Sequence, residues 1–125
     1  MGHSDRLVIA DGNFPVMSMG KNAQIIRMDG HGVPEILDAV LKVFPLDTYT
    51  EKPVNLMQVM PGDDAQTPIW DVYKKTVEKY DERGENAIGE IERFKFYEET
   101  KSVYAVIATS EKALYANIML QKGVV

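Results

Sequence analysis

The sequence has no cysteine, only two histidines, and no long hydrophobic run. Without cysteine the chain can form neither a disulfide framework nor a thiolate zinc site, which suits a reducing compartment. No apolar segment approaches the roughly 20 residues that span a bilayer, and the first residues lack the layout of a signal peptide. A net charge of -5 provides no positive field to attract nucleic acid. We therefore expect a cytoplasmic protein that binds a small uncharged molecule.

Motifs of several enzyme classes are absent as well. There is no glycine-rich phosphate loop, no histidine pair at helical ligand spacing and no Gly-x-Ser-x-Gly nucleophile elbow. A transition-metal site would have to rely on carboxylates, because thiolates are absent and imidazoles are scarce. We expect no metal and no cofactor.

The residues that are present are typical of a folded globular chain, with 45% hydrophobic and 26% charged residues, and the length fits one compact domain. Residues 7–10 form a short continuous apolar run that ends at Asp11, which predicts a strand buried on both faces with a carboxylate at its end. Further strands are predicted over 53–60, 90–96, 103–108 and 117–120.

Two segments carry apolar residues at helical spacing. One begins near Pro34 and ends before Pro45, and the other begins after Thr67 and ends around Gly84. Residues 97–101 are predicted as a short helical segment, residues 85–89 as an exposed link, and Ser110 as the cap of a brief turn over 111–114. Strands that alternate with helices favour a three-layer α/β/α domain with a largely parallel, mixed sheet.

Polar side chains at strand ends, or within predicted strands, are the candidates for chemistry. Each also has a purely structural interpretation: a solvated terminal histidine, a turn aspartate, a surface ion pair, a tyrosine at the edge of the core, or an asparagine bonded to backbone. His31, between two glycines, is interpreted as part of the turn that opens the first helix. The candidates are His3, Asp11, Arg93, Tyr97, Tyr115 and Asn117.

Several collinear strings resemble those of the L-fucose mutarotase family, which opens with Met-Gly-His-Gly-Asp and Ala-Asp-x-Asn-Phe-Pro. The resemblance covers essentially the whole chain, so chance is a weak explanation. The matching strings include Met1-Gly2-His3-Ser4-Asp5, Ala10-Asp11-Gly12-Asn13-Phe14-Pro15, Phe44-Pro45-Leu46-Asp47-Thr48-Tyr49, Thr67-Pro68-Ile69-Trp70, Ile91-Glu92-Arg93-Phe94-Lys95-Phe96-Tyr97-Glu98 and Leu114-Tyr115-Ala116-Asn117.

The resemblance implies a fold like that of D-ribose pyranase and a homo-oligomer, a ring or a decamer, with sites near subunit boundaries. It implies that His3 is the proton donor and that Tyr97 and Tyr115 are its partners in proton transfer. The residues implied to contact the sugar are Asp11, Arg93 and Asn117, with Asp47 and Met57 as weaker contacts.

The chain departs from the family pattern at Ser4 and Ser110, where glycine is usual, and at Arg6, where glutamate is usual. These substitutions affect the expected backbone geometry rather than the polar groups. Members of the family usually carry a helical segment ahead of the opening string. The expectation is therefore a single mutarotase domain, residues 1–125, without that leading helix.

The implied reaction interconverts the alpha and beta anomers of L-fucose by opening and closing the ring. One group removes the proton of the anomeric hydroxyl while another protonates the ring oxygen, which suits an imidazole beside two phenols. Met57 or Trp70 is expected to form an apolar wall for the methyl group of a 6-deoxy sugar. The alternatives are a D-ribose pyranase and a sugar-binding module without turnover.

Overall fold

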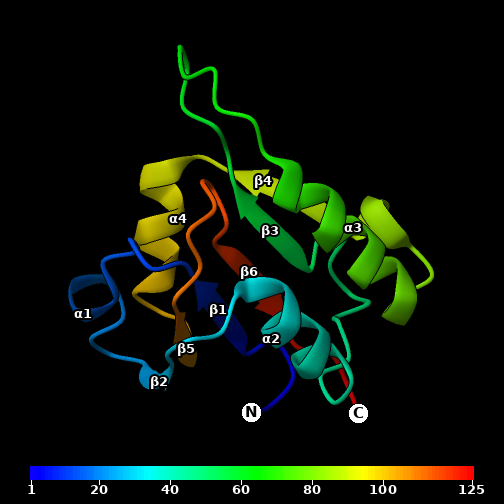
Figure 1. The fold of residues 1–125 in the computed structure, drawn as a ribbon. Coiled ribbons are helices and arrows are strands. Elements are labelled where there is room, and N and C mark those ends of the chain that lie inside the picture. The colour runs from blue at the N-terminus through cyan, green and yellow to red at the C-terminus, as the bar shows by residue number, and fades with distance from the viewer.

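A central six-stranded sheet organises the fold of the computed structural model, which describes residues 1–125 (Figure 1). Its order is β2-β5-β1-β6-β3-β4, and β6 is the one strand that runs antiparallel to its neighbours. The predicted mixed, largely parallel sheet is thus confirmed. The strands are β1 (Arg6–Ala10), β2 (Gln24–Met28), β3 (Val54–Met57), β4 (Ile88–Ile91), β5 (Ala105–Thr109) and β6 (Ile118–Gln121).

Alternate residues of the central strands enter two different cores. In β1, Leu7 and Ile9 join the larger cluster, and Val8 and Ala10 join the smaller one on the opposite face. Successive side chains of a strand point to opposite faces, so a strand covered on both sides is apolar throughout. This explains why residues 7–10 form a continuous hydrophobic run.

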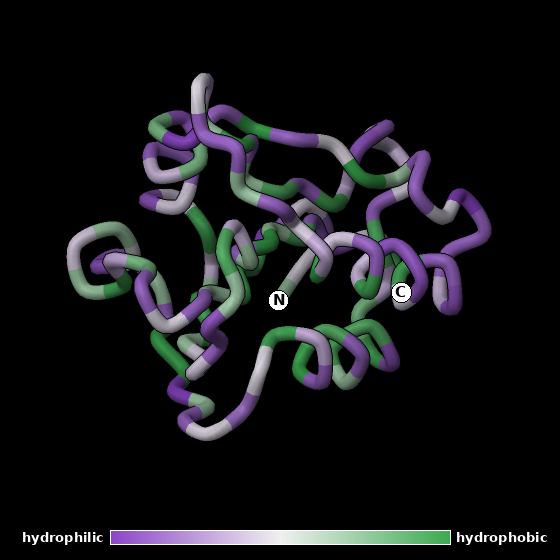
Figure 2. The backbone as a smooth tube through the Cα atoms, turned by 45° about the horizontal axis from the view of Figure 1, so that its top comes forward, coloured by the Kyte–Doolittle hydropathy of each residue, from purple (hydrophilic) through white to green (hydrophobic).

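Helices cover both faces and complete three layers (Figure 1). On the face of the larger core lie α2 (Val33–Leu41) and α3 (Pro68–Tyr80), followed by the short helix η1 (Gly84–Ala87). On the other face lie α1 (Val16–Met19) and α4 (Arg93–Thr100). In Figure 2 the backbone of α2 alternates between hydrophobic and hydrophilic colours, as expected for a helix buried on one side. No helix has both the length and the apolar character to cross a membrane.

The prediction for residues 90–101 was wrong in its boundaries. The strand is β4, which ends at Ile91, and the segment after it is the helix α4 rather than a continuing strand. Glu92 causes the change, because its carboxylate accepts hydrogen bonds from the backbone N–H groups of Phe94 and Lys95 and so caps the helix.

Two smaller predictions also need correction. The link 85–89 is not wholly exposed, since Ala87 is buried and belongs to η1. Ser110 does not cap a turn over 111–114; its hydroxyl accepts from Gly30 N–H, and the Glu111 carboxylate accepts from the backbone of Lys112 and Ala113. The short elements α1 and β2 were not predicted.

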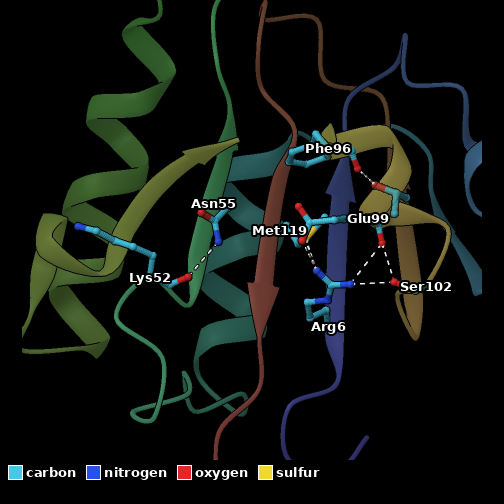
Figure 3. A network of polar contacts seen from close by, with 8 residues as sticks. Arg6, Lys52, Asn55, Phe96, Glu99, Ser102 and Met119 are labelled. Atoms are coloured by element: carbon cyan, nitrogen blue, oxygen red, sulfur yellow. Dashed lines mark hydrogen bonds and ion pairs between the residues drawn. The ribbon is translucent and has the colours of Figure 1, made fainter. Parts of the chain in front are cut away.

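Two of the departures from the family pattern have clear structural consequences. Ser4 has φ of 72°, in the left-handed region that favours glycine. Arg6 ties β1 to α4: one guanidinium nitrogen lies 2.9 Å from Glu99 Oε1 and the other donates to Ser102 Oγ at 2.8 Å (Figure 3). Its side chain also approaches the sulfur of Met119 in β6.

Candidate active site

A pocket opens where β1 and β3 end and β6 begins, at the same edge of the sheet. Open α/β sheets generally bind ligands in a crevice outside the carboxyl ends of their strands. The cavity measures about 230 Å³, below the range of roughly 300–1,000 Å³ typical of drug-sized ligands, so it fits one small molecule. Its lining consists of Asp11, Asn13, Phe14, Met57, Asp63, Arg93, Tyr97, Ala113, Leu114, Tyr115 and Asn117.

A buried polar pair forms the floor of this pocket. Asp11 is 8% exposed and Asn117 is 5% exposed. Asn117 Oδ1 accepts from Asp11 N–H at 2.7 Å, and Asp11 Oδ1 accepts from Asn13 N–H at 3.0 Å. Burial raises the pKa of the Asp11 carboxyl, and backbone N–H groups of Asn13, Phe14 and Ala116 only partly oppose it. With Asn117 Oδ1 in use, the amide nitrogen of Asn117 remains available as a donor to a ligand.

Helix α4 supplies a cation and a phenol on one side of the pocket. Because Glu92 caps the helix, Arg93 lies in the first turn and Tyr97 one turn later. Arg93 Nε donates to the Tyr97 hydroxyl at 3.2 Å, and the guanidinium carbon lies 5.7 Å from the centre of the Tyr97 ring. The other guanidinium nitrogens of Arg93 stay free to bind a ligand.

The second phenol is held by a strained turn. Tyr115 has φ of 53°, a conformation uncommon for a large side chain. Two aromatic residues of α3 bind this turn, since Trp70 Nε1 donates to Tyr115 O at 2.8 Å and the Tyr73 hydroxyl donates to Ala116 O at 2.6 Å. At its other end, the Tyr115 hydroxyl donates to Asp63 Oδ2 at 2.5 Å.

His3 and Asp47 lie elsewhere, at the opposite end of the sheet. His3 precedes β1 and Asp11 follows it, and a strand of five residues extends about 16 Å. The His3 ring is 41% exposed, lies 3.3 Å from Asp47 Oδ1 through Nε2, and contacts the ring of Tyr49. One chain therefore brings together Asp11, Met57, Arg93, Tyr97, Tyr115 and Asn117, but it does not bring His3 or Asp47 to them.

Asp47 is itself fully engaged. It is 2% exposed and accepts hydrogen bonds from Tyr49 N–H at 2.9 Å, Gln121 Nε2 at 2.8 Å and His3. These donors, led by Tyr49 N–H, hold the pKa of the Asp47 carboxyl below its usual value.

Two other sequence expectations can be compared with the pocket. His31 pairs with Glu35 at 3.0 Å in the first turn of α2, as expected for turn chemistry. Met57 lines the pocket as an apolar wall, but Trp70 does not, because its indole is engaged with the backbone of the Tyr115 turn. Nowhere do three or more His, Cys, Asp or Glu side chains gather in a way that could hold a metal ion.

Sequence reasoning missed one pocket residue with a charged group, Asp63. It lies in the connection between β3 and α3, within Pro61-Gly62-Asp63-Asp64. This string indicated only a turn that ends a strand, and nothing in its composition pointed to a contact with Tyr115, 52 positions further along the chain.

Comparisons with known proteins agree over the full length of the chain. The model of the RbsD / FucU transport protein family matches residues 1–125. Human fucose mutarotase is 46% identical over 128 residues, covering 99% of this chain and 82% of the human protein. The L-fucose mutarotase of Actinobacillus pleuropneumoniae serotype 5b is 38% identical over 124 residues, covering 99% of this chain and 84% of that protein.

Solved structures give the same result. FucU from Bifidobacterium longum is 63% identical with a TM-score of 0.98, covering 100% of this chain and 87% of that chain. The fucose mutarotase from Streptococcus pneumoniae, in complex with L-fucose, is 42% identical with a TM-score of 0.92, covering 100% and 86%. Bacillus subtilis RbsD complexed with D-ribose is more distant, at 25% identity and a TM-score of 0.73, covering 100% and 86%.

Proposed function

The chain belongs to the RbsD / FucU transport protein family, and we propose that it is an isomerase that interconverts the alpha and beta anomers of L-fucose. One observation carries the proposal. A single small pocket gathers a buried carboxylate, an amide, a guanidinium and two phenols, in a chain similar throughout to a mutarotase whose complex contains L-fucose. Mutarotation needs hydroxyl-binding groups and proton donors and acceptors, which this set provides.

Asp11, Arg93 and Asn117 hold the sugar in this proposal. The carboxylate accepts hydrogen bonds from hydroxyls, the guanidinium donates them, and the free amide nitrogen of Asn117 donates one more. Each of these groups is left unpaired by an epimer whose hydroxyl points the other way, which penalises the wrong sugar. Met57, almost fully buried, faces the apolar methyl group.

Tyr97, Tyr115 and His3 form the proton-transfer set, each by donating a proton or by hydrogen-bonding the hydroxyl that loses one. As the ring opens, the anomeric hydroxyl loses its proton, the bond between the anomeric carbon and the ring oxygen breaks, and the ring oxygen gains a proton. Closing the ring on the other face reverses each step. A positioned acid and base contribute on the order of a hundred- to ten-thousand-fold, enough for a reaction that already proceeds slowly in water.

His3 belongs to this set only if it comes from a second copy of the chain. Because β1 separates it from Asp11, the imidazole cannot reach the pocket of its own chain. The ring is well exposed and its one acidic partner, Asp47, lies beside it. We therefore propose a homo-oligomer in which His3 and Asp47 of one copy complete the pocket of its neighbour. We also propose that this oligomer is cytoplasmic.

The test is anomer exchange of L-fucose followed by NMR saturation transfer between the two anomeric protons. The parent chain accelerates exchange, and His3→Ala lowers the acceleration about a hundredfold or more while the fold is kept. His31→Ala is the matched control, because His31 is the only other histidine and pairs with Glu35 outside the pocket. Full activity of His3→Ala excludes the imidazole from the reaction.

Mixing variants tests the shared site directly. His3→Ala and Tyr97→Phe chains are each inactive alone, and after they are unfolded and refolded together roughly a quarter of the sites regain both groups if neighbours share them. No recovery on mixing means that the imidazole and the phenol do not meet across a subunit boundary.

A ribose pyranase and a binding module without turnover are the two competing functions. D-Ribose and D-galactose assayed beside L-fucose separate the first, since a pyranase accelerates exchange between ribose pyranose and furanose forms. Calorimetry separates the second, which binds fucose saturably while the exchange rate stays at that of buffer.

A further inference from the structure

The two phenols of the pocket differ in how their hydroxyl groups are bonded. A phenol has a single proton to donate, and its oxygen can also accept. The Tyr97 oxygen accepts from Arg93 Nε, and its own proton has no protein acceptor. The Tyr97 proton is therefore free to be donated into the pocket.

The Tyr115 hydroxyl is bonded in the opposite sense. Its proton is directed to Asp63 Oδ2 at 2.5 Å, and its oxygen accepts from Met60 N–H at 3.3 Å. Because a carboxylate only accepts, the direction of the first bond is fixed while Asp63 is ionised. What Tyr115 has left for a ligand is the remaining acceptor capacity of its oxygen.

Asp63 is itself oriented by the loop that carries it. Its Oδ1 accepts from Ala65 N–H at 2.9 Å, its own N–H donates to Met60 O at 3.0 Å, and Gly62 before it has φ of 85°. The turn thus holds one carboxylate oxygen and directs the other at the phenol. In Figure 1 this connection extends beyond the body of the fold between β3 and α3.

From these contacts we propose that Asp63 is a positioning residue that commits Tyr115 to accepting a hydrogen bond from a sugar hydroxyl and leaves proton donation to Tyr97 and His3. The inference rests on the proposed function and deepens it, because it gives the two tyrosines different tasks. Asp63 acts through Tyr115 and need not touch the sugar itself.

The electrostatics of the two groups agree with this division. The hydrogen bond to Asp63 raises the pKa of the Tyr115 phenol above its ordinary value and lowers the pKa of the Asp63 carboxyl. Met60 N–H and the Arg93 charge act on Tyr115 in the opposite sense but do not reverse the shift. Tyr115 therefore stays protonated, with its proton turned away from the ligand.

The experiment compares Asp63→Asn with Asp64→Asn, a matched loss of one carboxylate on the next residue, which is exposed and does not line the pocket. Each variant is labelled with carbon-13 at the phenol carbon of tyrosine, and Tyr115→Phe identifies the Tyr115 signal. We expect Asp63→Asn to move the Tyr115 titration down towards the ordinary pKa of a phenol, and Asp64→Asn to leave it in place.

The same variants are assayed by anomer exchange. Asp63→Asn lowers the turnover rate about tenfold, the size expected for one hydrogen bond, with KM little changed. Asp64→Asn keeps the parent rate. Asp63→Glu retains a carboxylate, so its turnover rate and its Tyr115 pKa lie between those of Asp63→Asn and the parent. An unchanged Tyr115 titration, or an unchanged turnover rate in Asp63→Asn, overturns the assignment.

Failure of the proposed function is recognised separately. If the parent chain does not accelerate exchange of L-fucose, the mutarotase proposal is wrong and the role of Asp63 is lost with it. If the parent is active but Asp63→Asn has the turnover rate and the Tyr115 titration of the parent, the proposed function is kept. The proposal that the two tyrosines have different tasks is then wrong.

Discussion

Asp11 and Asp47 lie at opposite ends of the same sheet and are almost equally hidden from solvent, yet their carboxyl groups are shifted in opposite directions. Burial raises the pKa of Asp11, whereas the donors around Asp47, first among them Tyr49 N–H, lower its pKa. The fold surrounds one carboxylate with enough hydrogen bonds and leaves the other short of them.

This difference separates a buried charge that donors of its own chain satisfy from one that lacks such donors. Asp47 accepts from a backbone amide, a glutamine and a histidine, so its negative charge stabilises the folded state. Asp11 lines the pocket, and in the proposed function the sugar hydroxyls supply the donors that it lacks. A buried acid that costs stability when the site is empty is characteristic of a functional site.

Replacing Asp11 by asparagine should have the largest effect, and only on function. Asn at position 11 keeps an oxygen for Asn13 N–H but loses the charge, and a hydrogen bond to a charged group is worth about 1.5–3 kcal/mol, so exchange falls roughly ten- to a hundredfold. Thermal unfolding is unchanged or moves to higher temperature, because the buried charge is gone. A large drop in melting temperature would mean that the Asp11 charge stabilises the fold, as the Asp47 charge does.

Replacing Asp47 by asparagine should instead destabilise the fold. Its two carboxylate oxygens accept from donors on different sides, and an amide can present an oxygen to only one of them. A buried donor left unpaired costs about 1–3 kcal/mol, measured as a lower urea midpoint with the parent m-value. If Asp47→Asn is as stable as the parent, the Asp47 carboxylate does not stabilise the fold and the proposed contrast with Asp11 is wrong.

The dependence of folding stability on pH under acidic conditions also distinguishes Asp11 from Asp47. The folded-state pKa of Asp47 is lowered. The stability that this carboxylate contributes is therefore present above the ordinary aspartate pKa, and it is lost as the pH falls through the folded-state pKa. The folded-state pKa of Asp11 is raised. The stability that this carboxyl group contributes is therefore greatest below the ordinary aspartate pKa, and it is lost as the pH rises through the folded-state pKa. Urea midpoints between about pH 3 and 6 should therefore fall less steeply with acid in Asp47→Asn and more steeply in Asp11→Asn.

Ser4 offers the smallest effect, at the same end of the sheet as Asp47. Ser4→Gly relieves a left-handed conformation that costs about 1–2 kcal/mol, but it adds freedom to the unfolded chain worth about 0.4–1 kcal/mol. A net gain of about 0.5 kcal/mol should appear in chemical denaturation, with Ser110→Gly as the control because Ser110 has no positive φ and its hydroxyl accepts from Gly30. A loss of stability in Ser4→Gly would show that its backbone is not strained.

The elements with strong hydrophobic periodicity could be predicted from the sequence. The central strand β1 and the helices α2 and α3 lie within about four residues of their predicted bounds, because each buries an apolar face. The edge strand β2 gave no such signal, since Gln24, Ile25, Ile26 and Arg27 are all exposed. The boundary at Glu92 depends on a cap, which alternating hydrophobicity does not reveal.

Some residues of the site could likewise be predicted from the sequence, and others could not. Family strings indicated six residues that the fold gathers in one pocket, and periodicity alone would have left Tyr97 and Tyr115 as tyrosines at the edge of the core. The contacts of Asp63 with Tyr115 and of His3 with Asp47 join residues 52 and 44 positions apart. Such distant pairs follow from the topology of the sheet and not from any local pattern.

The position of β6 has a consequence for synthesis on the ribosome. This strand is the last of the sheet in chain order, yet it lies between β1 and β3 and is the only strand that hydrogen-bonds to both the β2-β5-β1 and the β3-β4 groups. Until it emerges, the facing edges of β1 and β3 lack their hydrogen-bond partner, and chaperones would have to protect such unpaired strand edges. Folding is therefore completed after translation of β6, and cleavage just before Ile118 should leave an insoluble remnant rather than a smaller folded unit.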